Sequence, residues 1–572
     1  MKEDQKNFLL FAVLAAAILF GWPTIAAWVF PQQNPAPTMV DGKTVNVPAP
    51  AANPTADTPK AIRDRGLVLK ESPRVVIDTP SLKGSINLKG ARIDDLVLAT
   101  YPETIAKGSP SIRLLSPAGT SDAYFAGFGW RDDGLKPPTP DTMWQTSGPV
   151  LSPGKPVTLS AANGQGQVFR IELAVDEKYM FTVKQTVANV GTGVVPVAPY
   201  GLVYRSGVFK EPDSWTVHVG PMSVHNDAAD YDVNFSHLDE QKSVDFTSSK
   251  AWLGFTDKYW LTALVPDQSA VVAGKFRGAP NGAYQADFTR NPQLLQPGKQ
   301  ISHTSRFFAG AKETALIDTY EASGVTMFGK SIDWGWFEPL EKPIFYYLDW
   351  LFRMVGNFGV AIIFLTITIR ALLFPIANKQ FESLARMRIL QPKMKALQER
   401  YKDDKPRQQQ EIMKLYKEEK ANPLGGCLPM LLQIPIMYAL YKVLLLTIEM
   451  RHQPFVLWIH DLSAPDPATI LNLFGYLPFH VPSFLAIGVI PVLLGVSMHY
   501  QIKLNPAPMD DMQKQIFAIM PWMLMFVMAP FAVGLQVYWI TSNVLTILQQ
   551  RWLYSKHPAL KEPLPKKEAK TK

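Results

Sequence analysis

The chain has 572 residues, which is too long for one ordinary domain and predicts at least two folded units. Lysine and arginine outnumber aspartate and glutamate by 57 to 49, and the net charge of +8 favours an anionic partner such as nucleic acid or lipid headgroups. The single cysteine, Cys427, excludes an intrachain disulfide and a cysteine-based zinc cluster.

The chain begins with an apolar run that predicts a membrane anchor over residues 1–30. Two lysines precede the run, which extends over residues 8–30 and is longer than the apolar part of a signal peptide. A cleavable signal peptide is the alternative, because small residues near the end of the run suit a signal peptidase. Residues 31–60 are rich in proline, alanine and asparagine, which predicts a flexible linker.

Residues 61–330 have the pattern of a large antiparallel β-sandwich. Short segments rich in Val, Ile, Tyr and Phe are separated by Gly, Pro, Asn and Asp. The clearest predicted strands are 74–78, 84–88, 96–99, 168–175, 179–187, 194–204 and 270–276.

Three histidines and three aspartates lie close together in this region: His218, His225, His237, Asp227, Asp230 and Asp232. A metal or sugar-active site is one interpretation, but their spacing matches no metal motif, and polar residues scattered on loops are favoured. The sequence also contains no Ser-His-Asp order, phosphate loop or paired-carboxylate spacing. We therefore predict no catalytic residue, no metal and no cofactor.

Residues 331–354 combine charges with tryptophan, tyrosine and phenylalanine, whose polar tips prefer the headgroup zone. This predicts an amphipathic helix on the outer leaflet, with a helix packed on the sandwich as the alternative. Apolar runs then predict five more spans, at 355–376, 424–448, 483–502, 516–531 and 533–552. The last two meet at a turn near Pro530 and are too long together for one crossing, so they predict a helical hairpin.

The distribution of positive charge predicts the orientation of these spans. Segment 377–423 carries twelve lysines and arginines and tail 553–572 carries six lysines, whereas loop 449–482 has only Arg451. By the positive-inside rule both termini, segment 377–423 and loop 503–515 are cytoplasmic. The sandwich and loop 449–482 then lie on the external side of the membrane, and six spans satisfy every loop.

Segment 377–423 predicts two helices joined near residues 403–406. Met387, Leu390 and Met394 recur at alternating spacings of three and four, as in a coiled coil. The basic faces of these helices are either simply solvated or dock on an anionic partner, such as lipid headgroups or ribosomal RNA.

Arg370 lies inside an apolar run, where an arginine costs ~2.5–3.5 kcal/mol unless it is paired or faces water. Snorkelling toward the cytoplasmic interface is the open alternative. Thr366 lies one turn away on the same helix face. Further polar residues within the predicted spans are Gln433, Gln536, Thr541, Ser542, Asn543 and Thr546.

Polar groups in lipid must be satisfied by other protein groups or by water, so this set predicts one shared wet cavity. The apolar runs of the predicted spans contain no acidic residue. A cavity with a fixed cation and no carboxylate does not suit a cation or proton pump, but it would attract an acidic residue of a passing peptide.

Several motifs resemble the YidC family of membrane protein insertases. They are Ile369-Arg370 with Phe374-Pro375, MRILQPK at 387–393, NPLGGC at 422–427 with Gln433 and Pro435, LWIHDLS at 457–463, and Tyr538 followed by Ser542-Asn543. The run GSINLKG at 84–90 fits the Gram-negative branch. The resemblance therefore extends over almost the whole chain.

The resemblance implies a polytopic α-helical inner-membrane protein of six spans, with a five-helix insertase core and a large external β-sandwich. The core would hold a groove that is closed to the outside but open to cytoplasm and lipid, with Arg370 inside. Thr366, Ile434, Pro435 and Trp539 match family positions that meet the substrate helix; Trp539 departs from the usual tyrosine there. The sandwich resembles a sugar mutarotase that has lost its chemistry.

The implied function is a non-enzymatic insertase and chaperone, acting alone or with the Sec translocon and its accessory subunits. Its partners would be nascent membrane proteins, the lipid bilayer, the ribosome and the signal recognition particle pathway, but not DNA. A secondary transporter, an anchored envelope carbohydrate-active enzyme and an assembly factor for the translocon are the alternatives. A transporter should bind a small solute, and an enzyme should keep its activity in a soluble 60–330 fragment.

Overall fold

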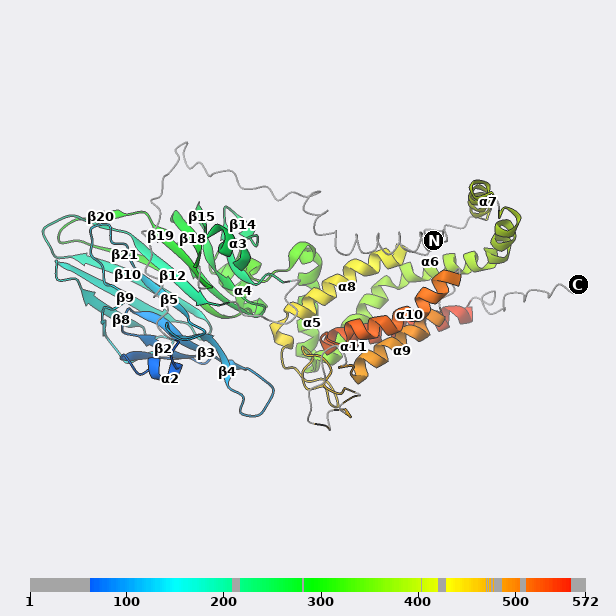
Figure 1. Ribbon diagram of the computed structural model, residues 1–572, viewed down its shortest axis with the longest axis horizontal. Helices are drawn as coiled ribbons and strands as arrows, with labels where there is room; N and C mark the ends of the chain where they lie inside the picture. The colour runs from blue at the N-terminus through cyan, green and yellow to red at the C-terminus, as the bar shows by residue number, and fades with distance from the viewer. Residues whose placement is uncertain are drawn as a thin grey trace, which may run out of the picture.

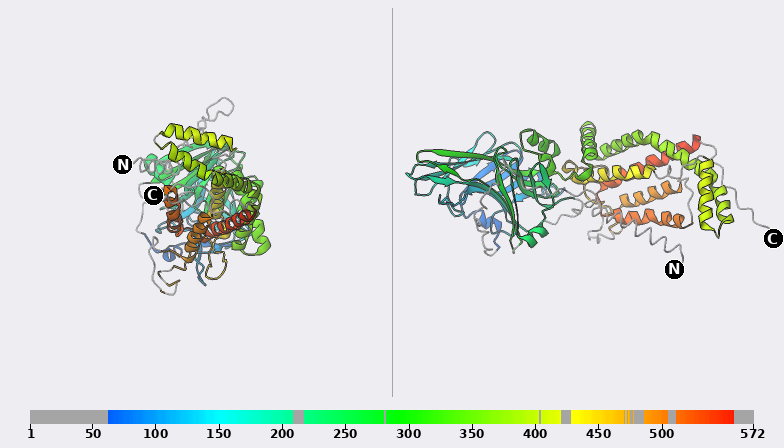
Figure 2. Two further views of the ribbon diagram at one scale, coloured as in Figure 1. Left: turned by 90° about the vertical axis from the view of Figure 1, so that its right-hand side faces the viewer. Right: turned by 90° about the horizontal axis from the view of Figure 1, so that it is seen from above.

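The computed structural model describes residues 62–207, 217–279, 282–402, 404–419, 428–469, 471, 473–474, 477, 486–504 and 511–556. A sheet domain (62–330) and a helical core (331–556) follow one another along the chain and meet end to end (Figures 1 and 2). The predicted anchor at 1–30 and linker at 31–60 lie outside the described residues.

Two large sheets form the sheet domain. The first, in spatial order, contains β15 (Ser243–Ser248), β18 (Val272–Ala279), β19 (Ala283–Arg290), β12 (Pro199–Ser206), β5 (Tyr124–Trp130), β3 (Arg92–Pro102), β2 (Leu82–Asn87), β1 (Arg74–Asp78) and β7 (Val150–Leu151), with β4 (Ser111–Leu115) beside β3. The second contains β14 (Ala228–Asp230), β13 (Gly220–His225), β16 (Trp252–Thr256), β17 (Trp260–Val265), β21 (Gln300–Ala311), β10 (Met180–Asn189), β9 (Gln167–Val175), β8 (Val157–Ala162) and β6 (Gln145–Thr146). A small pair joins β11 (Val195–Val197) to β20 (Gln293–Leu295).

The core lies between the two large sheets. Every second residue of β9 is buried, as expected when one face of a strand packs inward. Phe128 of β5 and Phe307 of β21 make an edge-to-face contact across the core, with ring centroids 6.2 Å apart. The predicted β-sheet domain is thus confirmed, with two differences of detail: β7 pairs parallel to β1, and predicted strand 194–204 is divided at Ala198 into β11 and β12.

The helices of the sheet domain are α2 (Arg65–Val68), α3 (Phe235–Gln241) and α4 (Thr314–Ala322). The helical core contains α5 (Glu338–Val355), α6 (Phe358–Arg400), α7 (Lys405–Glu418), α8 (Leu428–Leu446), α9 (Val489–Lys503), α10 (Asp511–Met528) and α11 (Val533–Lys556). Short 3-10 turns are η2 (Phe328–Ser331), η3 (Gly335–Phe337) and η5 (Ile448–Met450).

Helix α5 buries Phe345, Leu348 and Leu351 against α6 and α8 and leaves Trp350 exposed. It therefore packs on the helical core, and it also reaches the sheet domain, because the Tyr346 hydroxyl donates to Asp318 of α4. At its C-terminal end Gly356 adopts a φ of 69°, which favours glycine and stops the helix.

Helix α6 is a single helix of 43 residues that contains all of the predicted second span except its first three residues, and the first arm of the predicted hairpin. Its length of about 65 Å, at ~1.5 Å per residue, exceeds the thickness of a bilayer. Helix α7 lies at the end of the molecule farthest from the sheet domain (Figures 1 and 2).

Among the described residues, one segment, Phe358–Asn378 of α6, is both long and apolar enough to cross a membrane. Ile434–Leu446 and Gln515–Met528 are shorter apolar helices. The count of six spans therefore stays a prediction.

Candidate functional site

Arg370 of α6 is half-buried and faces α11. Its Nε donates to the Ser542 hydroxyl oxygen at 3.2 Å and its Nη2 donates to the same oxygen at 2.5 Å. The sequence grouped these two residues only as polar positions in different spans. The structure brings them into direct contact.

Two further predicted residues extend this polar contact between helices. Asn543, the neighbour of Ser542, donates through Nδ2 to the Ser497 hydroxyl of α9 at 2.9 Å. Ser542 and Asn543 are both buried, and α11 packs against both α6 and α9. The pair therefore connects α11 to a different helix on each side, as expected where polar groups must be satisfied by protein.

Thr366 is buried, and its hydroxyl donates to the Ile362 carbonyl oxygen of its own helix at 2.7 Å. A hydroxyl bonded in this way is already satisfied and exposes little polarity. Trp539 is half-buried and packs on the apolar core of the bundle. Gln433, Ile434 and Pro435 follow one another in α8, and the Ile434 side chain is about half exposed.

Gln536 has a different environment from the other predicted residues. It is fully buried, and its Nε2 donates to the carbonyl oxygens of Met528 and Phe531 at 3.0 and 2.9 Å. These bonds close the turn between α10 and α11. The predicted hairpin of 516–531 and 533–552 accordingly folds as two helices, with Gln536 stabilising the turn between them.

The charge on Arg370 is not neutralised by any carboxylate among the described residues. Its bonded partner is the neutral Ser542 hydroxyl, and Tyr538 lies close enough to interact with it electrostatically. A guanidinium has five donors in a planar fork that matches a carboxylate. This site can therefore still bind an anionic group.

Lys442 is a buried cation of the helical core that the sequence analysis did not single out. It lies near the sheet-domain end of α8, and its Nζ donates to the Asp333 carbonyl oxygen at 2.8 Å. An isolated lysine four residues before the end of an apolar helix was the available signal. The burial of Lys442 was not predicted, because a single cation does not prevent an apolar run from being interpreted as a span.

The histidines and aspartates of 218–237 do not converge on one site. The His218 Nε2 lies 2.7 Å from the Pro221 carbonyl oxygen, and burial lowers its pKa. The ring of His225 stacks on Phe246, and His237 Nδ1 lies 3.0 Å from the Asp232 carbonyl oxygen. No group of three potential metal ligands occurs in the described parts of the chain.

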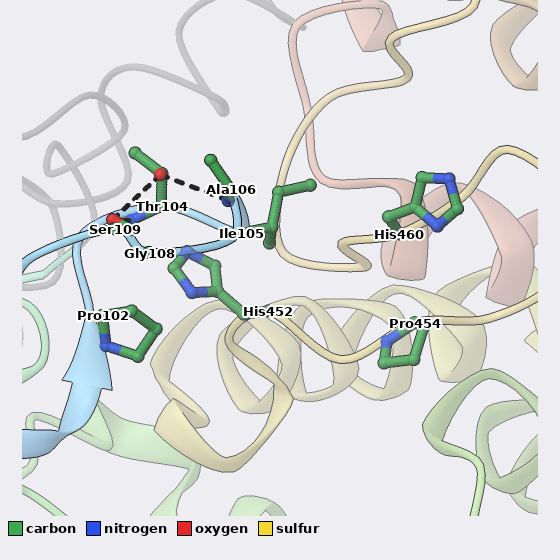
Figure 3. A pocket seen from close by; sticks show the side chains of 9 residues that line it. All are labelled: Pro102, Thr104, Ile105, Ala106, Gly108, Ser109, His452, Pro454 and His460. Atoms are coloured by element: carbon green, nitrogen blue, oxygen red, sulfur yellow. Dashed lines mark hydrogen bonds between the residues drawn. The ribbon is translucent and has the colours of Figure 1, made fainter.

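A cavity of about 640 Å³ lies where the β3–β4 loop meets the segment after α8 (Figure 3). His452 and His460 line it, but they stand apart in the cavity, and His452 contacts Asp461 instead. Arg451 closes this junction by donating to the carbonyl oxygens of Pro102 and Glu103 at 2.9 and 3.2 Å. The cavity is thus a gap between the sheet domain and the helical core, two bodies that Arg451 already joins.

Comparison with known proteins gives this architecture a family. A family model described as 60Kd inner membrane protein matches residues 350–561, and one described as YidC periplasmic domain matches residues 74–347. The chain is 47% identical to the membrane protein insertase YidC of Zymomonas mobilis subsp. mobilis, over 98% of this chain and 97% of that protein.

The chain belongs to the YidC family of membrane protein insertases. A second relative, from Beijerinckia indica subsp. indica, is 44% identical, with 96% of each chain covered. A crystal structure described as an active YidC insertase with its first transmembrane domain resolved covers 84% of this chain and 95% of its own, at 18% identity and a TM-score of 0.36.

The chain is therefore an inner-membrane protein, and its sheet domain is periplasmic. The family confirms the predicted function, a non-enzymatic membrane protein insertase, over the transporter and carbohydrate-active enzyme alternatives. The resemblance of the sheet domain to a sugar mutarotase stays a prediction, as do the roles of the individual groove residues.

Proposed function

We propose that the helical core inserts hydrophobic segments of nascent membrane proteins through a hydrophilic groove around Arg370 that is open to cytoplasm and lipid. The observation that supports this is the Arg370–Ser542 contact, a half-buried cation held by a neutral hydroxyl. Such a cation attracts an acidic residue more strongly than one already paired, because an arginine-carboxylate contact can form two parallel hydrogen bonds.

The polar segment of a client moves partway across while its acidic residue contacts Arg370. The apolar helix that follows leaves the groove between α8 and α10 and enters lipid. Burial of its surface, worth ~25 cal/mol per Å², drives this step. In this proposal Ile434 of α8, whose side chain is about half exposed, contacts the departing helix.

The proposed topology has six spans, with both termini, segment 377–423 and tail 553–572 in the cytoplasm. Large apolar side chains are exposed on helices of the core, among them Leu372 of α6, Ile519 of α10 and Leu548 of α11. Exposure of this kind suits contact with lipid rather than water. Residues 331–354, which include α5, are the proposed interfacial segment.

The proposed partners beyond the client and the bilayer are the Sec translocon with its accessory subunits, and the ribosome with the signal recognition particle pathway. The basic hairpin of α6 and α7 supports contact with an anionic surface such as ribosomal RNA, because this lysine- and arginine-rich segment lies at the end of the molecule farthest from the sheet domain (Figure 1).

An insertion assay tests the proposal. The full-length protein is reconstituted in liposomes with a single-span client that has an acidic outer tail, and protease protection of the tail is measured. Arg370→Ala should reduce protection at least tenfold, equivalent to about 1.4 kcal/mol. The matched control is Arg353→Ala on α5, whose guanidinium is exposed and paired with Asp349 at 2.8 Å.

A second client, with its acidic residues replaced by asparagine and glutamine, distinguishes an electrostatic role of Arg370 from a structural one. Arg370→Ala should not change the insertion of this client. An equal loss for both clients would show that Arg370 is structural, and no protection above empty liposomes would contradict autonomous insertion.

A further inference from the structure

A charged contact lies buried where the helical core meets the sheet domain. Lys442 of α8 is only 2% exposed. Its Nζ donates to the Asp333 carbonyl oxygen at 2.8 Å and lies 3.5 Å from Asp333 Oδ2. A buried ammonium is costly unless it is paired and hydrogen-bonded, so this contact fixes α8 to the segment between η2 and η3.

Asp333 also contacts the sheet domain. Its Oδ2 accepts a hydrogen bond from the His218 backbone N–H at 3.1 Å. Nearby, the Tyr231 hydroxyl donates to the Lys330 carbonyl oxygen at 2.6 Å. A continuous set of hydrogen bonds therefore runs from Lys442 of α8 through Asp333 to His218, which lies just before β13 of the sheet domain.

Glu341 of α5 lies beside this contact and is fully buried. Neither of its carboxylate oxygens has a hydrogen-bond partner among the described residues. Burial raises the pKa of Glu341 to about 8, against the opposing attraction of Lys442. At neutral pH this side chain is therefore mostly an uncharged carboxylic acid.

The charged and titratable groups around Glu341 come from each element packed there. Asp333 and Glu338 disfavour its ionisation, and Glu338 is itself paired with Lys330 and Lys342. Tyr438 of α8 also interacts with Glu341. Burial lowers the pKa of His218 in the sheet domain, so its imidazole is neutral at pH values above the ordinary histidine pKa. Lys442 is the cation that the ionised carboxylate would attract.

We propose that Lys442 is a positioning residue that couples α8 to the sheet domain, and that the protonation of Glu341 controls this coupling. While Glu341 is neutral, the ammonium stays with Asp333. When Glu341 ionises, two carboxylates compete for one ammonium, and the contact with Asp333 weakens.

This coupling would act on the proposed groove through α8 itself. Ile434 and Pro435 lie seven to eight residues before Lys442 in the same helix, about 11 Å along its axis at ~1.5 Å per residue. A rigid helix released at one end can shift at the other. The coupling itself, however, does not depend on the proposed insertion mechanism.

Hydrogen exchange of the full-length protein tests the coupling without an insertion assay. Exchange of peptides covering 328–341 and 436–446 is measured at pH 6.5 and 9.2, and each rate is divided by the intrinsic rate at that pH. The wild-type protein should lose about tenfold protection at pH 9.2, since a group with a pKa near 8 is then about nine-tenths ionised.

Three variants complete the test. Glu341→Gln should keep full protection at both pH values, and Lys442→Met should have low protection at both. Lys393→Met is the matched control, because Lys393 forms an ion pair with Glu419 at 2.6 Å in the distant hairpin; it should behave as the wild type. Lys442→Arg, which keeps the charge, should recover most of the protection lost in Lys442→Met.

Two results would overturn the proposal. A wild-type loss of protection that persists in Glu341→Gln would show that another group titrates. Unchanged protection in Lys442→Met would show that Lys442 does not couple the two bodies. If Lys442→Met fails to fold, Asp333→Asn replaces it, and unchanged protection in that variant would likewise overturn the coupling.

Discussion

Two arginines in this chain are withdrawn from water in different ways. Arg205 of β12 forms a bidentate ion pair with Asp257, with N–O distances of 2.8 and 3.1 Å, and both side chains are buried. Arg370 has only a hydroxyl partner among the described residues. The first cation is fully compensated and structural, whereas the second retains the capacity to bind an anion.

Removing the charge of Arg205 should therefore strongly lower the stability of the sheet domain. Arg205→Met leaves the Asp257 carboxylate buried without its partner, which should destabilise the sheet domain by about 3–5 kcal/mol. Hydrogen exchange of β12 and β16 in the full-length protein measures this. Lys83→Met is the control, because the pair of Lys83 and Asp78 is exposed and should contribute less than about 1 kcal/mol. Equal losses in the two variants would contradict the argument.

At the scale of secondary structure, local patterns located the strands well but did not predict that one helix continues past the end of a predicted span. The predicted strand 74–78 coincides with β1, because alternating burial is encoded within the segment. The boundary predicted at 376–377, between a span and a cytoplasmic segment, lies inside α6, which continues through Pro375 and Pro392 to Arg400. The change from apolar to polar residues marks where a helix would leave lipid; it does not end the helix.

The end of α6 is instead followed by a turn that depends on one capping residue. The Asp404 carboxylate accepts a hydrogen bond from the Arg407 backbone N–H at 3.1 Å and begins α7. Asp404→Ala should destabilise α7 by about 1 kcal/mol and speed hydrogen exchange in residues 405–418 roughly fivefold. Asp404→Asn caps almost equally well and should exchange like the wild type. Faster exchange in both variants would point to the charge rather than the cap.

At the scale of the whole molecule, the contacts that join the two bodies were beyond sequence reasoning. Arg451 bonds to Pro102 and Glu103, which lie 349 and 348 positions earlier in the chain. The polar residues of the spans did predict that Arg370 shares an environment with Ser542. They could not predict the individual pairing, the role of Gln536 in a turn, or the burial of Lys442, because each depends on how distant helices pack.

Glu449 of η5 provides a test of this junction. Its Oε1 accepts a hydrogen bond from the Thr314 backbone N–H of α4 at 3.1 Å, while Oε2 has no partner among the described residues. Burial raises the pKa of Glu449 from its ordinary value of 4.5 to about 7. The folded protein therefore holds a proton that the unfolded chain releases, so stability should fall as pH rises from about 4.5 to about 7.

Glu449→Gln keeps an oxygen for Thr314 but cannot ionise. It should raise the free energy of unfolding at pH 8 by up to about 3 kcal/mol relative to its effect at pH 4.5, as expected for a shift of ~2.5 pKa units. Thermal unfolding of the full-length protein at a series of pH values measures this difference. Because Glu341 contributes a slope of the same sign, the comparison of wild type with variant isolates Glu449. Glu172→Gln, at an exposed pair with Lys184, is the control and should follow the wild type at every pH. A Glu449→Gln protein that does the same would mean that the carboxylate is hydrated and that the two bodies separate readily at this point.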